Sequence, residues 1–269
     1  MRPGSGLGVA ASLRLVVSAA RSTAKQRIRT TSPVFYLMVW LGFPVFSVLL
    51  VVLIYRGNDS LRDYAVVAGA GLALLFGMQF NAAEILDGER QRGTLGNLFI
   101  SPAPRFVWLA GFQLYAVCES LLAAAVTLSV SVAMFGLVVS IDSVSLTVTT
   151  LLLFSCMWGF SMLIGAVGLA LRDANQLSNL LFPIIQLLAG TMYPVALMPD
   201  WIRLPAECLP FGYALQAIAD SVLHHASLAD LTADLVPLAG FAVVLPVVGV
   251  AAFRGVERRA RARGALELV

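Results

Sequence analysis

Unbroken stretches of apolar residues are the feature that most constrains how this 269-residue chain folds. Several stretches are about twenty residues long, the length that a helix needs to cross a hydrocarbon layer roughly 30 Å thick. The chain is 59% hydrophobic and only 12% charged, whereas about a quarter of the residues in an ordinary soluble domain are charged. One soluble globule cannot hide so much apolar surface, so we expect lipid to surround most of this chain.

We predict an all-α integral membrane protein with six transmembrane helices, bounded by Pro, Gly and charged residues. The predicted spans cover residues 34–55, 64–83, 106–132, 146–171, 177–195 and 235–253. They form one transmembrane domain, 33–253, between a basic N-terminal segment, 1–32, and a basic tail, 254–269. The fifth span contains Pro183, Gly190 and Pro194, which weaken a helix unless neighbouring segments satisfy the freed backbone groups. We therefore expect protein, and not lipid, around it.

Lys and Arg residues set the predicted orientation, because positive residues near span ends are retained in the cytoplasm. With the N-terminus inside, fifteen of the eighteen Lys and Arg residues fall on the cytoplasmic side, and only Arg56, Arg62 and Arg203 fall on the other. Both termini are therefore expected in the cytoplasm. We do not expect a cleaved secretory signal, because Arg14 interrupts the one apolar core near the N-terminus.

The N-terminal segment has the pattern of an amphipathic helix that lies at the membrane surface. Apolar residues recur on one face at helical spacing, namely Leu13, Val16, Val17, Ala20, Ala24 and Ile28. Basic residues line a neighbouring face, namely Arg14, Arg21, Lys25 and Arg29. The alternative is a basic leader that only sets the topology.

The cysteines and histidines form no metal or disulfide pattern. Cys118, Cys156 and Cys208 are odd in number and widely spaced, so we predict that they are small buried apolar side chains. His224 and His225 lie near acidic residues, but neighbours on a helix diverge by roughly a third of a turn and cannot easily face one ion. No metal site is predicted.

The sequence lacks a phosphate-binding loop and the motifs of an intramembrane enzyme. Such a loop has the pattern GxxxxGK[ST], but Lys25 is the only lysine and no glycine stands before it at that spacing. Neither a nucleophile paired with a base nor an HExxH motif occurs at membrane depth. We therefore predict that the chain has no catalytic residues, cofactor or metal of its own, and that any nucleotide energy must come from a partner.

The segment between the second and third spans, residues 84–105, mixes acids, arginines and apolar residues. This composition suits a short amphipathic helix at the membrane surface that contacts another protein. A solvated loop fits the composition equally well. The candidate contact residues are Glu84, Asp87, Glu89, Arg92, Gly93, Thr94, Leu95 and Leu98.

Four polar residues at membrane depth are candidates for a substrate path. Glu119 is the one carboxylate inside a predicted span, and burying it in lipid costs several kcal/mol, so it should face protein or a wet cavity. It either lines a path or holds the third span to a neighbour. Gln113, Asn179 and Gln186 are weaker candidates, because amides often bridge helices with about 1 kcal/mol or less.

The sequence resembles the ATP-binding-cassette type-2 permease family, which includes drug-resistance and polysaccharide export subunits. After the second span the resemblance rests on the acids, on Gly93-Thr94-Leu95 and on Pro102. A more specific match covers residues 179–183, 188–194, 198–201 and 209–215. Gly96 departs from the family, whose members often carry an acid or amide there, and this affects the charge contacts of the segment.

The resemblance implies a cytoplasmic coupling helix that docks on an ATPase, and an extracellular re-entrant hairpin between the fifth and sixth spans. The hairpin residues would be Gly190, Pro194, Pro199, Trp201 and Pro210. The implied partners are two copies of an ABC ATPase subunit, which bind ATP and magnesium, and a second permease, either identical or homologous. Membrane lipid and a hydrophobic substrate complete the set, and no nucleic acid is expected.

The expected function is ATP-driven export of a hydrophobic small molecule, such as a drug or an antibiotic, across a bacterial inner membrane. The alternative cargo is a polysaccharide, a glycolipid or another lipid-linked molecule. A rival of a different class is a membrane-assembly or sensor protein, which would share the topology without transport.

Overall fold

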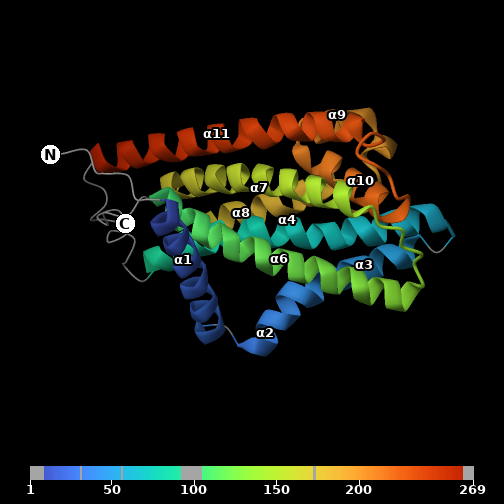
Figure 1. Ribbon diagram of the computed structural model, residues 1–269, viewed down its shortest axis with the longest axis horizontal. Helices are drawn as coiled ribbons and strands as arrows, with labels where there is room; N and C mark the ends of the chain where they lie inside the picture. The colour runs from blue at the N-terminus through green and yellow to red at the C-terminus, as the bar shows by residue number, and fades with distance from the viewer. Residues whose placement is uncertain (1–8, 31, 56, 92–104, 172–173, 263–269) are drawn as a thin grey trace.

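The computed structural model describes residues 9–30, 32–55, 57–91, 105–171 and 174–262, and all regular secondary structure within them is helical. The elements are α1 (Val9–Thr30), α2 (Pro33–Leu37), η1 (Met38–Gly42), α3 (Phe43–Ile54), α4 (Asp59–Gln91), α6 (Arg105–Phe135), α7 (Ser143–Leu171), α8 (Ala174–Leu188), η2 (Val195–Leu197), α9 (Asp200–Glu207), α10 (Pro210–Leu223) and α11 (Thr232–Ala262). Long helices α4, α6, α7 and α11 run along the long axis of the molecule (Figure 1).

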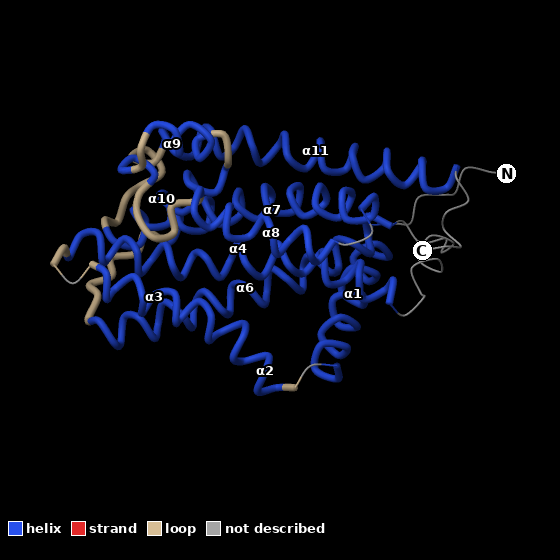
Figure 2. Tube along the Cα trace, turned by 180° about the vertical axis from the view of Figure 1, so that it is seen from behind, coloured by secondary structure: helices blue, strands red, loops and turns tan. Residues whose placement is uncertain are grey.

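The two ends of this bundle differ in what they hold. Helix α1 and the C-terminal end of α11 lie at one end, which we call the proximal end (Figure 1). Helices α9 and α10 and the turn after α6 lie at the other, the distal end, and Figure 2 shows the same arrangement from behind.

Four helices in the described part of the chain are long and apolar enough to cross a membrane. The qualifying segments are Asp59–Gln79, Ala110–Phe135, Ser143–Gly168 and Thr232–Val256, within α4, α6, α7 and α11. They fall in the second, third, fourth and sixth predicted spans. The first predicted span is divided among α2, η1 and α3, and only α3 is a shorter apolar helix in its own right. Its π-helical turn, η1, comes just before Pro44, whose ring displaces the ordinary backbone hydrogen bond to the preceding turn.

Three helices end at other residues than the predicted spans. Helix α4 continues to Gln91 and α11 continues to Ala262, because polar sequence outside the hydrocarbon layer still supports a helix. The fifth predicted span is too long, since α8 ends at Leu188. The reason is Gly190, whose φ of 72° lies in the left-handed region and ends the helix.

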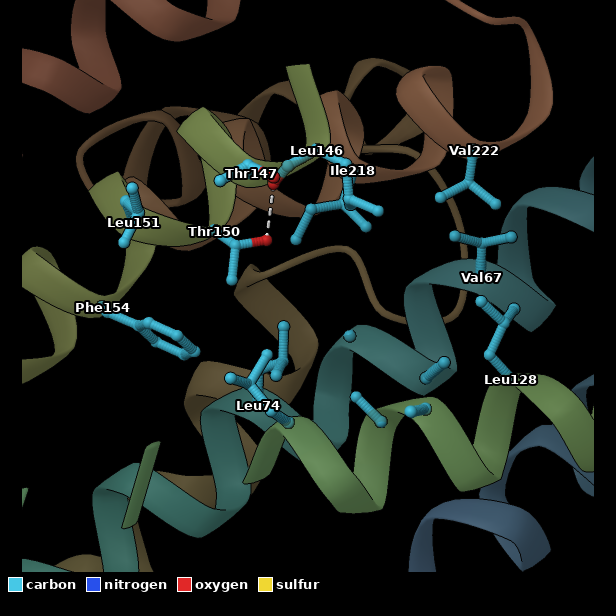
Figure 3. Close-up of a pocket in the computed structure, with 15 residues that line it drawn as sticks. Val67, Leu74, Leu128, Leu146, Thr147, Thr150, Leu151, Phe154, Ile218 and Val222 are labelled. Atoms are coloured by element: carbon cyan, nitrogen blue, oxygen red, sulfur yellow. Dashed lines mark hydrogen bonds between the residues drawn. The ribbon is translucent and has the colours of Figure 1, made fainter. Parts of the chain in front are cut away.

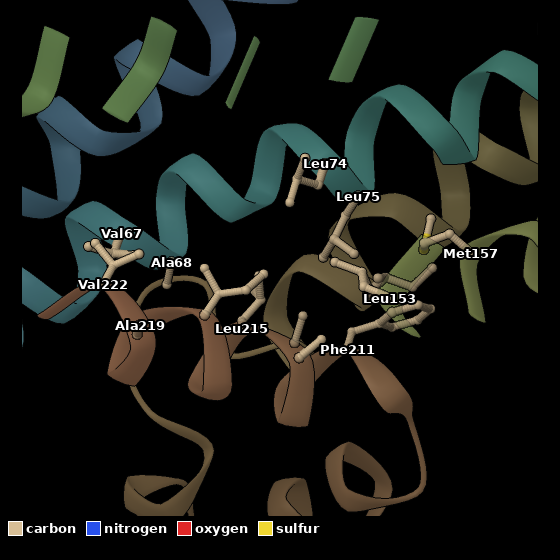
Figure 4. Close-up of a cluster of buried hydrophobic side chains, with 14 of the residues drawn as sticks. Val67, Ala68, Leu74, Leu75, Leu153, Met157, Phe211, Leu215, Ala219 and Val222 are labelled. Atoms are coloured by element: carbon tan, nitrogen blue, oxygen red, sulfur yellow. The ribbon is translucent and has the colours of Figure 1, made fainter. Parts of the chain in front are cut away.

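The hydrophobic core lies where α10 packs between α4 and α7. Phe211 and Leu215 on α10 are fully buried against Leu75 and other apolar residues of those helices (Figure 4). The ring of Phe211 lies edge-on to Phe160 of α7, with ring centres 5.3 Å apart. Helix α10 is therefore an internal element of the bundle.

The turn after α6 satisfies the last carbonyl groups of α10. The backbone N–H of Ser140 donates to the carbonyl of Val222, and that of Asp142 donates to Ser221, each at 2.9 Å. Asp142 is also the N-cap residue of α7, because its Oδ1 accepts the backbone N–H of Ser145 at 2.7 Å. This hydrogen bond holds the pKa of Asp142 below its usual value.

Helices α7 and α11 touch backbone to backbone. A Cβ atom added at Gly159 would meet the backbone of Leu245 and Pro246, so only glycine fits there. Pro246 has no N–H, so the carbonyl of Ala242, four residues earlier, lacks its helical donor. The hydroxyl of Ser155 on α7 donates to that carbonyl at 2.7 Å.

Helix α1 crosses the proximal part of α6 at Gly111. A Cβ added at Gly111 would lie 2.5 Å from the Cβ of Ala19 and 2.6 Å from the carbonyl oxygen of Val16. Ala19 and Thr23 are buried, whereas Val17 is exposed. The face that packs against protein is thus rotated from the predicted apolar face, because the small residues of α1 allow the closest approach to α6.

The prediction that all three cysteines are buried is wrong for two of them. Cys156 is buried between α7 and α11, but Cys118 and Cys208 are exposed. Cys118 lies on the outer side of α6 and Cys208 directly follows α9. An apolar side chain on a lipid-facing helix can be surrounded by lipid. Apolar neighbours in the sequence therefore do not show that a cysteine is covered by protein.

Candidate transport path and coupling elements

The acids of the predicted coupling segment lie on the proximal extension of α4. Glu84, Asp87 and Glu89 belong to this helix, which runs without interruption to Gln91. The other predicted contact residues lie outside the described residues, namely Arg92, Gly93, Thr94, Leu95 and Leu98. The first half of the segment is thus a continuation of α4.

The α6 residues of the predicted path are both buried. Glu119 is 8% exposed, and its Oε1 accepts the hydroxyl of Tyr115 one turn earlier at 3.3 Å. Gln113 is also buried, and its Oε1 accepts the hydroxyl of Ser161 on α7 at 3.5 Å. Gln113 therefore contributes to the contact between α6 and α7.

The α8 residues of the predicted path lie apart from the α6 pair. Asn179 is exposed and Gln186 is half-buried. Helices α6 and α8 each pack against α4, so the four residues lie in two groups on different helices, and their role in a path stays a prediction.

Gln79 is a buried polar residue that sequence reasoning missed. It lies on α4 with 0% exposure, and its Nε2 donates to the backbone carbonyl of Ser178 on α8 at 3.2 Å. Its Oε1 has no hydrogen-bond partner among the described residues. The sequence held a signal, because Gln79, like Asn81, is an amide within a largely apolar predicted span.

Three phenylalanines, which we call the aromatic cluster, join α3, α4 and α8. The ring centres of Phe43 and Phe76 lie 5.4 Å apart, those of Phe76 and Phe182 5.0 Å, and those of Phe43 and Phe182 6.0 Å. These distances are typical of attractive aromatic pairs. No sequence signal could have found the cluster, because phenylalanine is common throughout the apolar stretches.

Helix α8 has one face in the bundle and one face outside it. Phe182 and Ile185 are buried against neighbouring helices, whereas Leu180, Ile184 and Leu187 are exposed on the other side. Pro183 is on the exposed side as well. The expectation that this helix is surrounded by protein therefore holds for one of its faces within the single chain.

The predicted hairpin residues occupy the turns and helix starts of the distal end. Gly190 forms the turn after α8, and its carbonyl accepts the hydroxyl of Tyr64 on α4 at 3.0 Å. Pro194 and Pro199 precede η2 and α9, and Pro210 begins α10. Trp201 on α9 is 75% exposed, which suits an aromatic side chain at a membrane interface.

The long apolar helices, which pack around buried polar contacts, identify the class of protein as a multi-pass α-helical membrane protein. A family model described as ABC-2 type transporter matches residues 15–223, from α1 to the end of α10. The chain belongs to the ABC-2 type transporter family. It is the membrane permease component of such a transporter, and its family implies an ABC ATPase subunit as partner. No curated protein matches the chain.

Proposed function

We propose that this chain is the permease subunit of an ATP-driven exporter that carries a hydrophobic small molecule, such as a drug or an antibiotic, out of a bacterial cell. Family membership supports the permease role. Two observations support the cargo class: the aromatic cluster, in which Phe43 is exposed, and the exposed apolar face of α8. An apolar cargo gains contact area with aromatic rings, whereas a glycan needs many hydrogen-bonding partners.

The proposed membrane arrangement has six crossings with both termini in the cytoplasm. Besides the four long segments, α2, η1 and α3 together form the first crossing and α8 the fifth. Arg14, Arg21 and Lys25 of α1 are exposed, and this basic surface supports a cytoplasmic position for the proximal end. Helices α9 and α10 then form the re-entrant hairpin on the outside.

A second permease copy is proposed to cover the exposed face of α8. Pro183 has no N–H, so the carbonyl of Asn179 lacks its helical donor. Such a group is tolerated at membrane depth only where protein or a water-filled cavity meets it. Helices α3 and α8 of two copies would then enclose the cargo between them, with the aromatic cluster of each copy beside it.

Two ATPase subunits, with their ATP and magnesium, would dock below the proximal end. Closure of the ATPases on nucleotide would pull the coupling segments of the two permeases together. The facing helices would then open toward the outside, and nucleotide hydrolysis would reset them. Because the residues of this chain contribute only binding and movement, the chain has no chemical step of its own.

Cysteine cross-linking tests the arrangement of the two copies. Ile184→Cys, in a background without native cysteines, should form a disulfide between copies in membranes. The matched control is Val243→Cys on α11, which is also exposed but lies on a different helix and should not cross-link. Equal cross-linking at both positions would show that α8 does not form the contact.

Transport by the purified permease–ATPase complex in phospholipid vesicles tests the cargo class. We expect ATP-dependent movement of a fluorescent hydrophobic dye, and a several-fold higher KM in Phe43→Ala, because Phe43 is the exposed member of the aromatic cluster. Phe241→Ala on α11 is the matched control, half-buried outside the aromatic cluster, and should leave KM unchanged. Movement of a lipid-linked glycan but of no dye would favour the alternative cargo. ATPase stimulation without movement of any cargo would favour the sensor.

A further inference from the structure

An apolar pocket of about 450 Å³ opens on the side of the bundle between α6 and α7 (Figure 3). Its floor is formed by α4 and by Ile218 and Val222 of the internal helix α10. The aromatic cluster and the exposed face of α8 contribute no residue to it. The pocket is therefore separate from the transport path proposed above.

Small side chains keep the pocket open. Gly71 of α4 and Ala124 and Ala125 of α6 line it, and none of these side chains reaches across the space between the helices. A Cβ at Gly71 would have to displace the side chain of Leu215, which is fully buried on α10. The close packing of α10 on α4 thus favours glycine at this position in the pocket lining.

The pocket is elongated along the helix axes. Its lining on α7 runs from Leu146 to Phe154, which corresponds to about 12 Å at the rise of an α-helix. Its lining on α6 runs from Leu121 to Leu128, or about 10 Å. Most of each stretch lies in the distal half of a segment that can cross a membrane. The long direction of the pocket therefore follows the direction of lipid chains within one leaflet.

The chemistry of the lining suits hydrocarbon. None of the lining residues is charged, and the hydroxyl-bearing ones are Thr147 and Thr150. Each hydroxyl donates to a carbonyl of its own helix at 2.7 Å, Thr147 to Ser143 and Thr150 to Leu146. Neither threonine offers a hydrogen-bond donor to an occupant, so a polar cargo would lose its partners here.

We propose that this pocket holds one acyl chain of a membrane phospholipid from the leaflet at the distal end. A hydrocarbon chain has the required length and direction and needs no hydrogen bonds, and it supplies the dispersion contacts that a void would lack. Because the floor includes α10, the bound chain also supports the buried helix of the proposed hairpin. This inference requires only that α6 and α7 cross the membrane, so it does not depend on the cargo.

Photochemical labelling tests the proposal with the full chain and its ATPase in nanodiscs. The probe is a phosphatidylcholine that carries a diazirine near the end of one acyl chain, and labelled peptides are identified by mass spectrometry. We expect the segment from Leu146 to Phe154 to be labelled several-fold more than the exposed segment of α11 around Val243 and Val244. Labelling of both segments to the same extent would overturn the proposal, because it would indicate ordinary surrounding lipid.

The second part of the experiment fills the pocket with a larger side chain. Ala125→Trp should lower labelling of the Leu146 to Phe154 segment several-fold. Ala133→Trp is the matched control, since Ala133 is also exposed on α6 but does not line the pocket, and it should change nothing. If Ala125→Trp does not fold, Ala125→Leu should give a smaller decrease. Unchanged labelling in a folded Ala125 variant would overturn the proposal, as would a Leu151→Cys disulfide between copies without lipid labelling.

Discussion

A single serine hydroxyl compensates for a proline in the middle of the bundle. Ser155 donates to the Ala242 carbonyl that Pro246 leaves without its helical donor. We expect Ser155→Ala to destabilise the protein by about 1 kcal/mol, the usual size of a hydrogen bond between membrane helices. The measurement is the unfolding free energy in mixed micelles.

A double-mutant cycle distinguishes this account from a general packing effect. Pro246→Ala restores the backbone N–H that pairs with Ala242. In that background Ser155→Ala should cost much less than it does in the native chain. An equal cost in both backgrounds would contradict the role assigned to the hydroxyl.

The role of the Glu119 charge can also be tested by a single substitution. We expect Glu119→Gln to assemble normally, because the amide oxygen still accepts the Tyr115 hydroxyl, and to lose transport if the charge belongs to the path. Tyr115→Phe serves as control, since it removes the donor and keeps the carboxylate, and it should transport normally. Full transport by Glu119→Gln would leave this residue a structural role only.

At the scale of helices, α1 is held to α6 by the close approach at Gly111. In Gly111→Ala the new methyl group would press against Ala19 and the backbone at Val16. We expect α1 to detach partly, which hydrogen exchange of the amides around Ala19 and Thr23 would register as faster exchange. Gly240→Ala is the control, because a Cβ at Gly240 has open space around it. Unchanged exchange in Gly111→Ala would mean that α1 adjusts without separating.

The coupling segment after α4 gives a second prediction at this scale. An apolar anchor at an interface commonly contributes about 2 kcal/mol or more, whereas a charge at the rim contributes little. We expect Leu95→Asp to leave the permease folded in the membrane, but to release the ATPase and abolish transport. Glu89→Gln should retain both activities. If Leu95→Asp still purifies with its ATPase and still exports, the docking surface must be sought on α1 or around Arg172.

For the whole molecule, the orientation in the membrane can be tested directly. Asn58 directly precedes α4 and His224 directly follows α10, and both are exposed. Single cysteines at these positions, without native cysteines, should react with an impermeant maleimide added from outside. A cysteine at the exposed Ser22 of α1 should react only after the membrane is opened. Reaction of Asn58→Cys or His224→Cys only after opening would exclude the proposed orientation.

The sequence alone determined the properties that depend on neighbouring residues. The length of the apolar stretches predicted an all-helical membrane protein, and α4, α6, α7 and α11 follow those stretches closely. Proline and glycine near residues 183–194 predicted a weakened fifth helix, and α8 ends there. The family also followed from local motifs, because such motifs keep their spacing along the chain.

Only the tertiary structure decided which distant residues meet. In a membrane protein, apolar residues suit positions that face lipid as well as positions that face protein. Hydropathy therefore could not identify α10 as internal or Cys118 as exposed. The aromatic cluster, the bond from Ser155 to Ala242 and the glycine contact of α1 with α6 each join helices far apart in the chain. Their positions depend on side-chain shape at helix crossings, and that shape acts only after the helices have packed.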